Sequence, residues 1–122
     1  MERHLGFALA LLGLASGNAL GAGDAEHGKA LYEARCTACH SIEYNGAGPA
    51  HKGLLGRKAG SMPGFGYSKA LRDSGVVWNE ETLSRWLANP EAFIPGQRMF
   101  VQTPEASDRE DLIAYLKQAT RR

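Results

Sequence analysis

The sequence contains only two cysteines, almost no net charge and no segment in which apolar and polar residues alternate as in a β-strand. Lys and Arg total 14, Asp and Glu total 13, and the two signs are interleaved along the chain. The lack of a basic stripe removes the usual indication of nucleic-acid binding, and the lack of an acidic run removes that of a disordered tail. Without an alternating segment or an internal repeat, the sequence predicts an all-α fold.

Long apolar runs are also scarce, and the clearest one lies near the N-terminus, where residues 5–14 are all Leu, Ala, Gly or Phe. This run follows a short polar start that carries Arg3 and precedes a stretch of small residues, which is the layout of a secretory signal peptide. We therefore expect residues 1–22 to be removed on export and residues 23–122 to form one small periplasmic domain. An uncleaved anchor is the alternative, because residues 5–22 approach the ~20 apolar residues of a spanning helix.

Helix signals occur at the start of the expected domain and in its second half. Asp24 is a suitable N-cap for a helix over residues 25–39. Gly28 is unfavourable inside that helix unless another backbone passes close by, and we adopt this second interpretation. Asn79 caps a further helix, which is expected to stop before Pro90.

The last helix has the clearest pattern in the chain. Ser107 and Glu110 form an S-x-x-E capping box at its start. Its apolar positions recur at helical spacing and are Leu112, Tyr115, Leu116 and Ala119. A short helical turn is also expected over residues 68–72, ended by Gly75.

Residues 41–66 are rich in glycine and proline and show neither helical nor strand periodicity. Loops of this length are uncommon inside compact domains and are usually functional. We interpret the segment as an ordered loop that surrounds a cofactor.

Residues 36–40 read Cys-Thr-Ala-Cys-His, which is the C-x-x-C-H signature of covalent haem attachment. Thiols three residues apart lie on the same side of a helical turn, so Cys36 and Cys39 can each add to one vinyl group of haem. The adjoining His40 then places its imidazole beside the iron as the proximal ligand. A disulfide between these thiols would close too short a loop to constrain the unfolded chain strongly.

Two other kinds of site use the same residue types. A thioredoxin-like redox pair would need a βαβ pattern beside the two cysteines, and the sequence has none. A zinc site could recruit Cys36, Cys39, His40 and His51, but no second pair of ligands follows at finger-like spacing. The pattern therefore favours haem.

The sixth iron ligand decides between an electron carrier and a catalyst, because a haem bound only by His40 has an open face. Met99 is the best candidate, since it follows a Pro-Gly turn and its soft sulfur favours ferrous iron. Met62 is its rival, and either methionine is otherwise a core-filling residue. His27 and His51 are most simply interpreted as solvated side chains.

Taken with the motif, several further segments resemble the class I, mitochondrial-type cytochromes c over nearly all of residues 23–122. The matching segments are Gly48-Pro49, residues 53–60, residues 64–68, Trp78, Asn89-Pro90, residues 94–96 and residues 111–116. The resemblance implies the cytochrome c fold, in which the N- and C-terminal helices cross and long loops surround one haem c. It also implies that Gly28 and Tyr32 let the two helices cross.

The resemblance further implies roles for individual residues. Met99 is expected to be the second axial ligand, and the backbone carbonyl of Pro49 to fix the tautomer of His40. The residues expected to bind the haem propionates are Arg57, Tyr67 and Trp78. Without the resemblance, these three are a surface arginine and two core aromatics.

These features predict a monomeric one-electron carrier that exchanges electrons with redox partner proteins and has no enzymatic activity. One alternative is a haem enzyme or gas sensor in which Met99 is displaced from the iron. Another is an electron-transfer subunit held permanently to a larger complex, which an exposed apolar patch would favour.

A few residues depart from the family pattern. His51 stands where the family usually has an apolar residue, Trp86 replaces a tyrosine near the methionine sulfur, and Leu71 replaces a polar residue of the pocket. The basic ring around the exposed haem edge is thin, and Glu91 stands at a position often held by lysine. Arg35 and Arg98 fit this ring, and with so few charges we expect weaker electrostatic steering toward an acidic partner.

Overall fold

A computed structural model describes residue 13 and residues 23–121 of the chain. The expected signal peptide therefore lies outside the described residues, apart from Gly13. The helices of the described part are α1 (Ala25–Arg35), α2 (Lys69–Asp73), α3 (Glu80–Ala88), α4 (Pro90–Phe93) and α5 (Ala106–Ala119). The predicted all-α fold is confirmed, and an isolated bridge between Lys58 and Val77 is the β pairing recorded within these residues. None of the described helices is long and apolar enough to cross a membrane.

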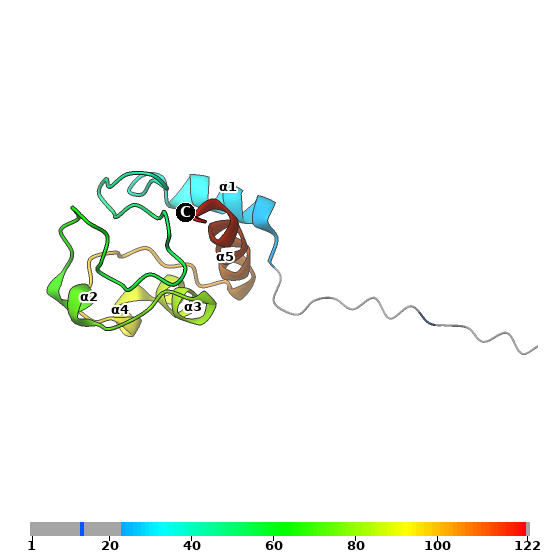
Figure 1. Cartoon of the computed structure of the whole chain (residues 1–122). Coiled ribbons are helices and arrows are strands. Elements are labelled where there is room, and N and C mark those ends of the chain that lie inside the picture. Colours follow the sequence, from blue (N-terminus) through cyan, green and yellow to red (C-terminus); the bar gives the residue numbers. More distant parts are fainter. Residues whose placement is uncertain (1–12, 14–22, 122) are drawn as a thin grey trace, which may run out of the picture.

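Helices α1 and α5, far apart in the sequence, lie against each other at one end of the molecule (Figure 1). The contact requires Gly28, because a Cβ atom there would lie 1.9 Å from the carbonyl oxygen of Asp111. One turn along, the rings of Tyr32 and Tyr115 pack with their centroids 5.3 Å apart. The expected helix crossing and the close approach at Gly28 are both confirmed.

Hydrogen bonds at the start of α1 reinforce this crossing. The side chain of Asp24 accepts from the N–H groups of Glu26 and His27, as expected for its N-cap. The Asp24 N–H in turn donates to Asp111 Oδ1 at 2.7 Å, and His27 Nδ1 lies 2.6 Å from Asp111 Oδ2. Asp111 therefore ties the first turn of α1 to α5.

The remaining helix boundaries agree with the sequence in part. Asn79 and Thr82 form a reciprocal capping box at the start of α3, and α3 ends before Pro90 as predicted. Pro90 then begins α4, a four-residue helix that the sequence analysis did not predict. The expected capping box at Ser107 is wrong, because the N-cap of α5 is Glu105, two residues before Ser107, and it makes no side-chain hydrogen bond.

A second difference concerns α1, which ends at Arg35 and not at Cys39. Residues 36–39 continue as a tight turn, in which the N–H groups of Cys39 and His40 both donate to the carbonyl oxygen of Cys36. All three motif side chains, those of Cys36, Cys39 and His40, line one pocket.

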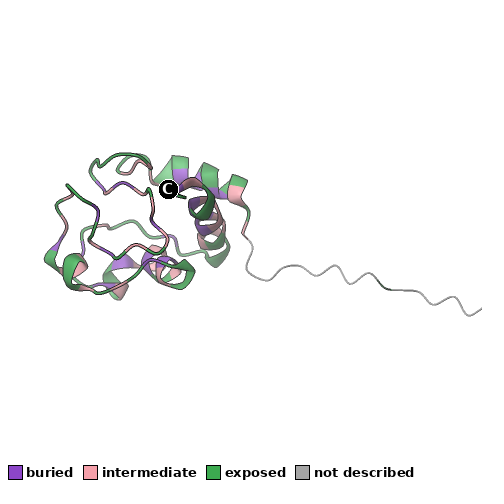
Figure 2. Ribbon diagram, in the orientation of Figure 1, coloured by how far each residue is buried: buried purple, intermediate pink, exposed green. Residues whose placement is uncertain are grey.

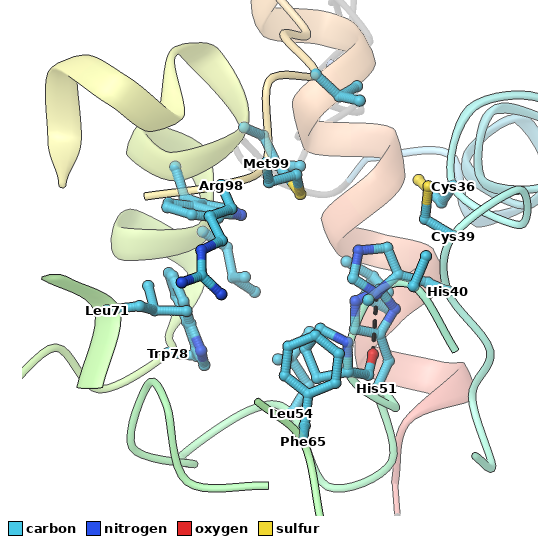
Figure 3. A pocket seen from close by; sticks show the side chains of 18 of the residues that line it. Cys36, Cys39, His40, His51, Leu54, Phe65, Leu71, Trp78, Arg98 and Met99 are labelled. Carbon is cyan, nitrogen blue, oxygen red and sulfur yellow. Dashed lines mark hydrogen bonds between the residues drawn. The ribbon is translucent and has the colours of Figure 1, made fainter. Parts of the chain in front are cut away.

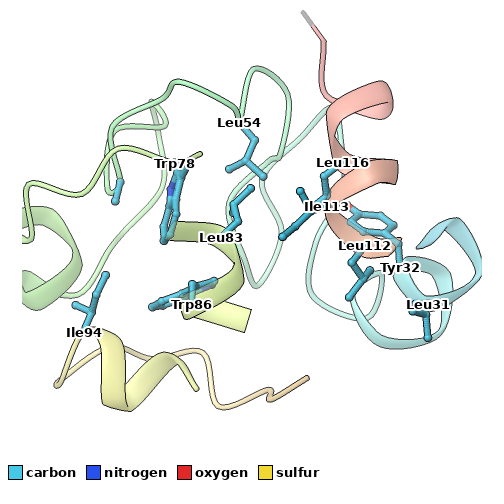
Figure 4. Close-up of a cluster of buried hydrophobic side chains, with 11 residues drawn as sticks. Leu31, Tyr32, Leu54, Trp78, Leu83, Trp86, Ile94, Leu112, Ile113 and Leu116 are labelled. Atoms are coloured by element: carbon cyan, nitrogen blue, oxygen red, sulfur yellow. The ribbon is translucent and has the colours of Figure 1, made fainter. Parts of the chain in front are cut away.

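The hydrophobic core lies between the α1–α5 pair and α3 (Figure 4). Leu112 of α5 is 1% exposed, and burying a leucine contributes about 1.5–3 kcal/mol. Figure 2 shows that the buried positions follow the inner faces of the helices and the inner side of the loops. The loops contribute core residues of their own, namely Leu54, Trp78 and Ile94.

Residues 41–66 form the expected long ordered loop. It contains no helix. Its backbone is bonded within the loop, where the N–H of Lys52 donates to Ile42 O, and to distant segments, where that of Gly53 donates to Thr120 O and that of Gly56 to Trp78 O. The N–H of Gly48 donates to Cys39 O. These bonds fix the loop in place, and several of its residues line a pocket.

Candidate haem-binding site

One pocket between the loop and the helices collects the residues that the sequence analysis singled out (Figure 3). Those on its walls are Cys36, Cys39, His40, Pro49, Arg57, Tyr67, Trp78 and Met99. Met62, the rival ligand, is buried elsewhere in the core and does not belong to the described lining of this pocket. The structure thus brings all the predicted site residues together.

The two cysteines lie at the C-terminal end of α1 and are not joined by a disulfide. Cys36 is partly buried and Cys39 is exposed. Burial raises the pKa of the Cys36 thiol to about 11, so this thiol is protonated at neutral pH. Both side chains lie on the same wall as His40, consistent with attachment of one group by two neighbouring thiols.

His40 is oriented by a backbone carbonyl, as expected. Its Nδ1 atom lies 2.9 Å from the carbonyl oxygen of Pro49. A carbonyl oxygen only accepts, so Nδ1 carries the hydrogen and Nε2 keeps its lone pair. Burial lowers the pKa of His40, and the bond to Pro49 opposes this effect. The side chain is therefore held as a neutral imidazole with one nitrogen available to a metal.

Two further residues restrict the His40 ring. A Cβ atom at Gly48 would lie 2.3 Å from His40 Cε1, so only glycine fits there without displacing the imidazole. The ring of His51 stacks on that of His40, with centroids 4.1 Å apart, and His51 Nδ1 is 2.9 Å from the hydroxyl of Tyr32. The expectation that His51 is solvated is therefore wrong: burial, together with His40, holds its pKa well below the usual value.

Met99 reaches the pocket from a different segment, between α4 and α5. Its side chain is partly buried and packs against the hydrophobic core, and Figure 3 shows the sulfur directed toward the space between the walls. Next to it, Phe100 is 76% exposed and Val101 is 43% exposed. One edge of the pocket is therefore apolar and open to solvent.

Polar groups on the pocket lining can bind an anion. Arg57 donates from its two terminal nitrogens to the carbonyl oxygens of Lys52 and Ala50, but its Nε is buried without a partner in the described part of the chain. The hydroxyl of Tyr67 accepts from the N–H of Met62, so its own hydrogen is free for a further acceptor. Trp78, only 6% exposed, lies beside them and packs on Trp86.

Comparison with known proteins identifies the arrangement. The family model described as cytochrome c matches residues 25–120. The chain belongs to the cytochrome c family. It is thus a single-haem electron carrier, and the family's one covalent haem c corresponds to the C-x-x-C-H spacing of Cys36 and Cys39.

Relatives within the family match most of the chain. A cytochrome c from Gibberella zeae is 46% identical over 103 residues, covering 81% of this chain and 97% of the relative. A cytochrome c from Euglena viridis is 44% identical and covers 78% of this chain and 96% of the relative. Among solved structures, cytochrome cH from Methylobacterium extorquens is similar, with a TM-score of 0.75 and 42% identity, covering 79% of this chain and 99% of that one.

The pocket of this family member fits a haem c on its own chemistry. Two free thiols and a neutral imidazole lie on one side, a thioether is supplied from another segment, and the walls between them are mostly apolar. The unpartnered Nε of Arg57 supplies a buried donor for a carboxylate, which haem carries as propionate groups. A bound haem would supply reversible one-electron chemistry at its iron.

Three further residues shape this site, and their roles are not predicted from the sequence. His51 was placed in solvent, although it stacks on His40. Gln97 was not singled out, and it is 3% exposed and hydrogen-bonded to the backbone of Met99. Glu91 was discussed only for its charge, whereas its carboxylate accepts two hydrogen bonds. No local pattern indicates these contacts, because each depends on how the chain folds back on itself.

Proposed function

We propose that this cytochrome c carries single electrons in the periplasm and that His40 and Met99 would hold the iron of its haem. The observation that supports the ligand pair is that one pocket contains both side chains, with His40 Nε2 free of its own hydrogen and the Met99 sulfur directed inward. Two strong ligands leave no open coordination position, which favours transfer of electrons over binding of a substrate.

The proposal includes the groups that hold the two haem propionates. Arg57 donates from its buried Nε, and Tyr67 donates from the hydroxyl that already accepts a bond from Met62. Trp78 lies in the same wall and donates from its indole nitrogen. Hydrogen bonds from these three donors to the two carboxylates offset the cost of burying their charge in an apolar pocket.

We place electron exchange at the edge marked by Phe100 and Val101. Both side chains are exposed although they are apolar, and they follow Met99 directly. The basic residues near this edge are few: Arg98 is exposed, and the charge of Arg35 is partly offset by Asp108, whose Oδ2 lies 3.5 Å from its terminal nitrogen. A redox partner that meets this edge would be recognised by apolar contact more than by charge, so association is expected to depend weakly on salt.

The first experiment is an absorption spectrum of the haem-loaded protein in both oxidation states, with and without carbon monoxide. His40–Met99 ligation predicts a low-spin spectrum, a weak far-red sulfur-to-iron band when oxidised, and no carbon monoxide binding when reduced. Met99→Ala should abolish the far-red band and admit carbon monoxide, whereas Met62→Leu should change neither.

The opposite result would favour the enzyme or gas-sensor alternative. A high-spin spectrum of the unaltered protein, or carbon monoxide binding that equals that of Met99→Ala, would contradict ligation by Met99. The periplasmic location is tested separately: the haem-loaded protein should be recovered from the periplasmic fraction with a new N-terminus close to Gly23. An intact N-terminus in the membrane fraction would indicate the uncleaved anchor.

A further inference from the structure

The segment that presents Met99 has no regular secondary structure to hold it. It follows α4 and runs over residues 94–99, and the N–H of Gln97 makes a turn bond of 3.2 Å to Ile94 O. Gly96 has a φ of +91°, which places it in the left-handed region that favours glycine. The position of Met99 therefore depends on what anchors this short stretch.

The anchor is the carboxylate of Glu91, in the short helix α4. Its Oε1 accepts from the N–H of Gly96 at 3.0 Å, and its Oε2 accepts from the side-chain amide of Gln97 at 3.1 Å. The bonds from Gly96 and Gln97 favour the charged carboxylate and lower the pKa of Glu91. Both oxygens of a surface carboxylate are thus committed to the segment that leads to the ligand.

Gln97 passes the connection on to Met99. The side chain is 3% exposed, and its Oε1 accepts from the backbone N–H of Met99 at 2.5 Å. A carboxylate only accepts, so Gln97 must present its NH₂ group to Glu91 and keep its oxygen for Met99. The charge on Glu91 therefore sets the orientation of a buried amide, and the amide sets the position of the Met99 backbone.

We propose that Glu91 and Gln97 are positioning residues for Met99, which hold its backbone so that the sulfur stays in the pocket and resists displacement. This inference rests on the proposed ligation of iron by Met99. The three hydrogen bonds depend on one another. Without the Glu91 carboxylate, nothing requires the Gln97 amide to keep its oxygen directed at the N–H of Met99. Such a chain lets an irregular segment present a ligand in one place without a helix or strand of its own.

The test measures how easily an external ligand replaces Met99. Imidazole is titrated into the oxidised, haem-loaded protein while the far-red sulfur-to-iron band is followed. In Glu91→Gln one of the three bonds must be lost, whichever way the two amides turn, and in Gln97→Leu two are lost. We expect imidazole to bind about tenfold more tightly in Glu91→Gln, the factor that corresponds to one hydrogen bond to a charged group. Gln97→Leu should show at least as large a change.

Two control variants separate positioning from general effects. Glu33→Gln removes the same charge from an exposed side chain of α1 whose carboxylate has no hydrogen bond to another described residue, and it should leave imidazole binding unchanged. Ile113→Val weakens the core at α5, at a residue of the hydrophobic cluster that is not among the described lining of the pocket. It should lower the unfolding temperature without changing the affinity for imidazole.

A double variant provides the sharpest test, because the polarity of the chain can be reversed. Gln97→Glu alone places two carboxylates face to face and should release Met99 most readily. Adding Glu91→Gln to it lets the new amide accept from Gly96 and donate to the new carboxylate, which can still accept from Met99. The second substitution should therefore reverse part of the defect caused by the first, although it is harmful by itself.

The outcomes distinguish this inference from the proposed function. If the unaltered protein lacks the far-red band, ligation by Met99 fails and this inference fails with it. If the band is present but Glu91→Gln and Gln97→Leu bind imidazole as the unaltered protein does, only the positioning role is overturned. It is also overturned if Ile113→Val increases imidazole affinity equally, or if the double variant is no better than Gln97→Glu alone.

Discussion

The α1–α5 crossing and the loop of residues 41–66 lie on two sides of the same pocket, but they are held in different ways. The two helices form their own backbone hydrogen bonds and meet through side chains, with Gly28 allowing the close approach. The loop has only scattered backbone bonds of its own, such as Lys52 to Ile42, and it depends also on bonds to partners elsewhere in the chain, such as Gly53 to Thr120 and Gly56 to Trp78. The helical side is stabilised by packing, and the loop side by individual backbone conformations and hydrogen bonds.

This difference determines how each region responds to substitution. A packed crossing is intolerant of added volume, because its neighbours are backbone atoms that cannot move independently. In a loop with glycines at positive φ, a substitution is opposed mainly by backbone strain. A steric clash adds to this strain only where the fold brings another atom close to the glycine. Three predictions test this comparison, beginning with the one of largest effect.

Gly28→Val should cause the largest loss, because its Cβ would lie 1.9 Å from the Asp111 carbonyl oxygen and force α1 and α5 apart. We expect the free energy of unfolding to fall by about 3 kcal/mol, the upper range for overpacking a core. Urea denaturation of the haem-loaded protein measures it. Ala34→Val, at an exposed position of the same helix, is the matched control. Equal stability of the two variants would show that the crossing is not tightly packed.

Two glycines of the loop should give smaller and unequal losses. Gly60 has a φ of +76° and a Cβ there would lie 2.8 Å from Arg72 Cα, whereas Gly56 has a φ of +87° and open space around it. Gly56→Ala should therefore cost about 1 kcal/mol from strain alone. Gly60→Ala should cost about 2 kcal/mol, because contact with α2 adds to the strain. The same denaturation experiment measures both, and identical losses would mean that α2 gives way freely.

The smallest effect is expected from the exposed pair His27–Asp111 at the α1–α5 crossing. The hydrogen bond to Asp111 raises the pKa of His27 above 6.5, and the bond to His27 lowers the pKa of Asp111 below 3.8. A histidine whose pKa is raised by folding stabilises the fold fully below pH 6.5, and this contribution is lost as the pH rises through its pKa in the folded state. An aspartate whose pKa is lowered by folding stabilises the fold fully above pH 3.8, and this contribution is lost as the pH falls through its pKa in the folded state.

The pair therefore stabilises the crossing most between pH 3.8 and 6.5. The pair should make the unaltered protein more stable at pH 5 than at pH 8, two values that lie about one unit or more on either side of the histidine titration. Denaturation at both values should show that His27→Gln loses this contribution to the difference. Lys29→Gln, on the same helix and exposed, should retain the full difference. A difference that persists unchanged in His27→Gln would assign the pH dependence to other groups.

Much of the site can be predicted from the sequence alone. The C-x-x-C-H motif identifies Cys36, Cys39 and His40 because their roles depend on spacing within five consecutive residues. Met99 could be proposed only with the help of the family resemblance, since a lone methionine has no local signature. The position of His51 was predicted wrongly, because its stacking on His40 depends on how the loop returns to the turn after α1.

The helix signals show the same division. Asn79 and Asp24 act as caps in the structure because a cap needs only the next three residues. The box at Ser107 fails even though its pattern is correct, because α5 starts one residue before it. Local patterns compete with packing at helix ends, and packing against α1 and α3 determines where α5 lies.

The sequence by itself determined the fold class, the order of the main helices, the haem-attachment motif and the need for a close approach at Gly28. Each of these depends on residues that are near one another in the chain or, for the close approach, on the missing side chain of Gly28. Only the tertiary structure decided that Met99 and not Met62 lines the pocket, that His51 stacks on His40, and that Glu91 reaches Met99 through Gln97. These depend on contacts between segments that no local periodicity encodes, because the direction of each side chain is set only when the loops close around the pocket.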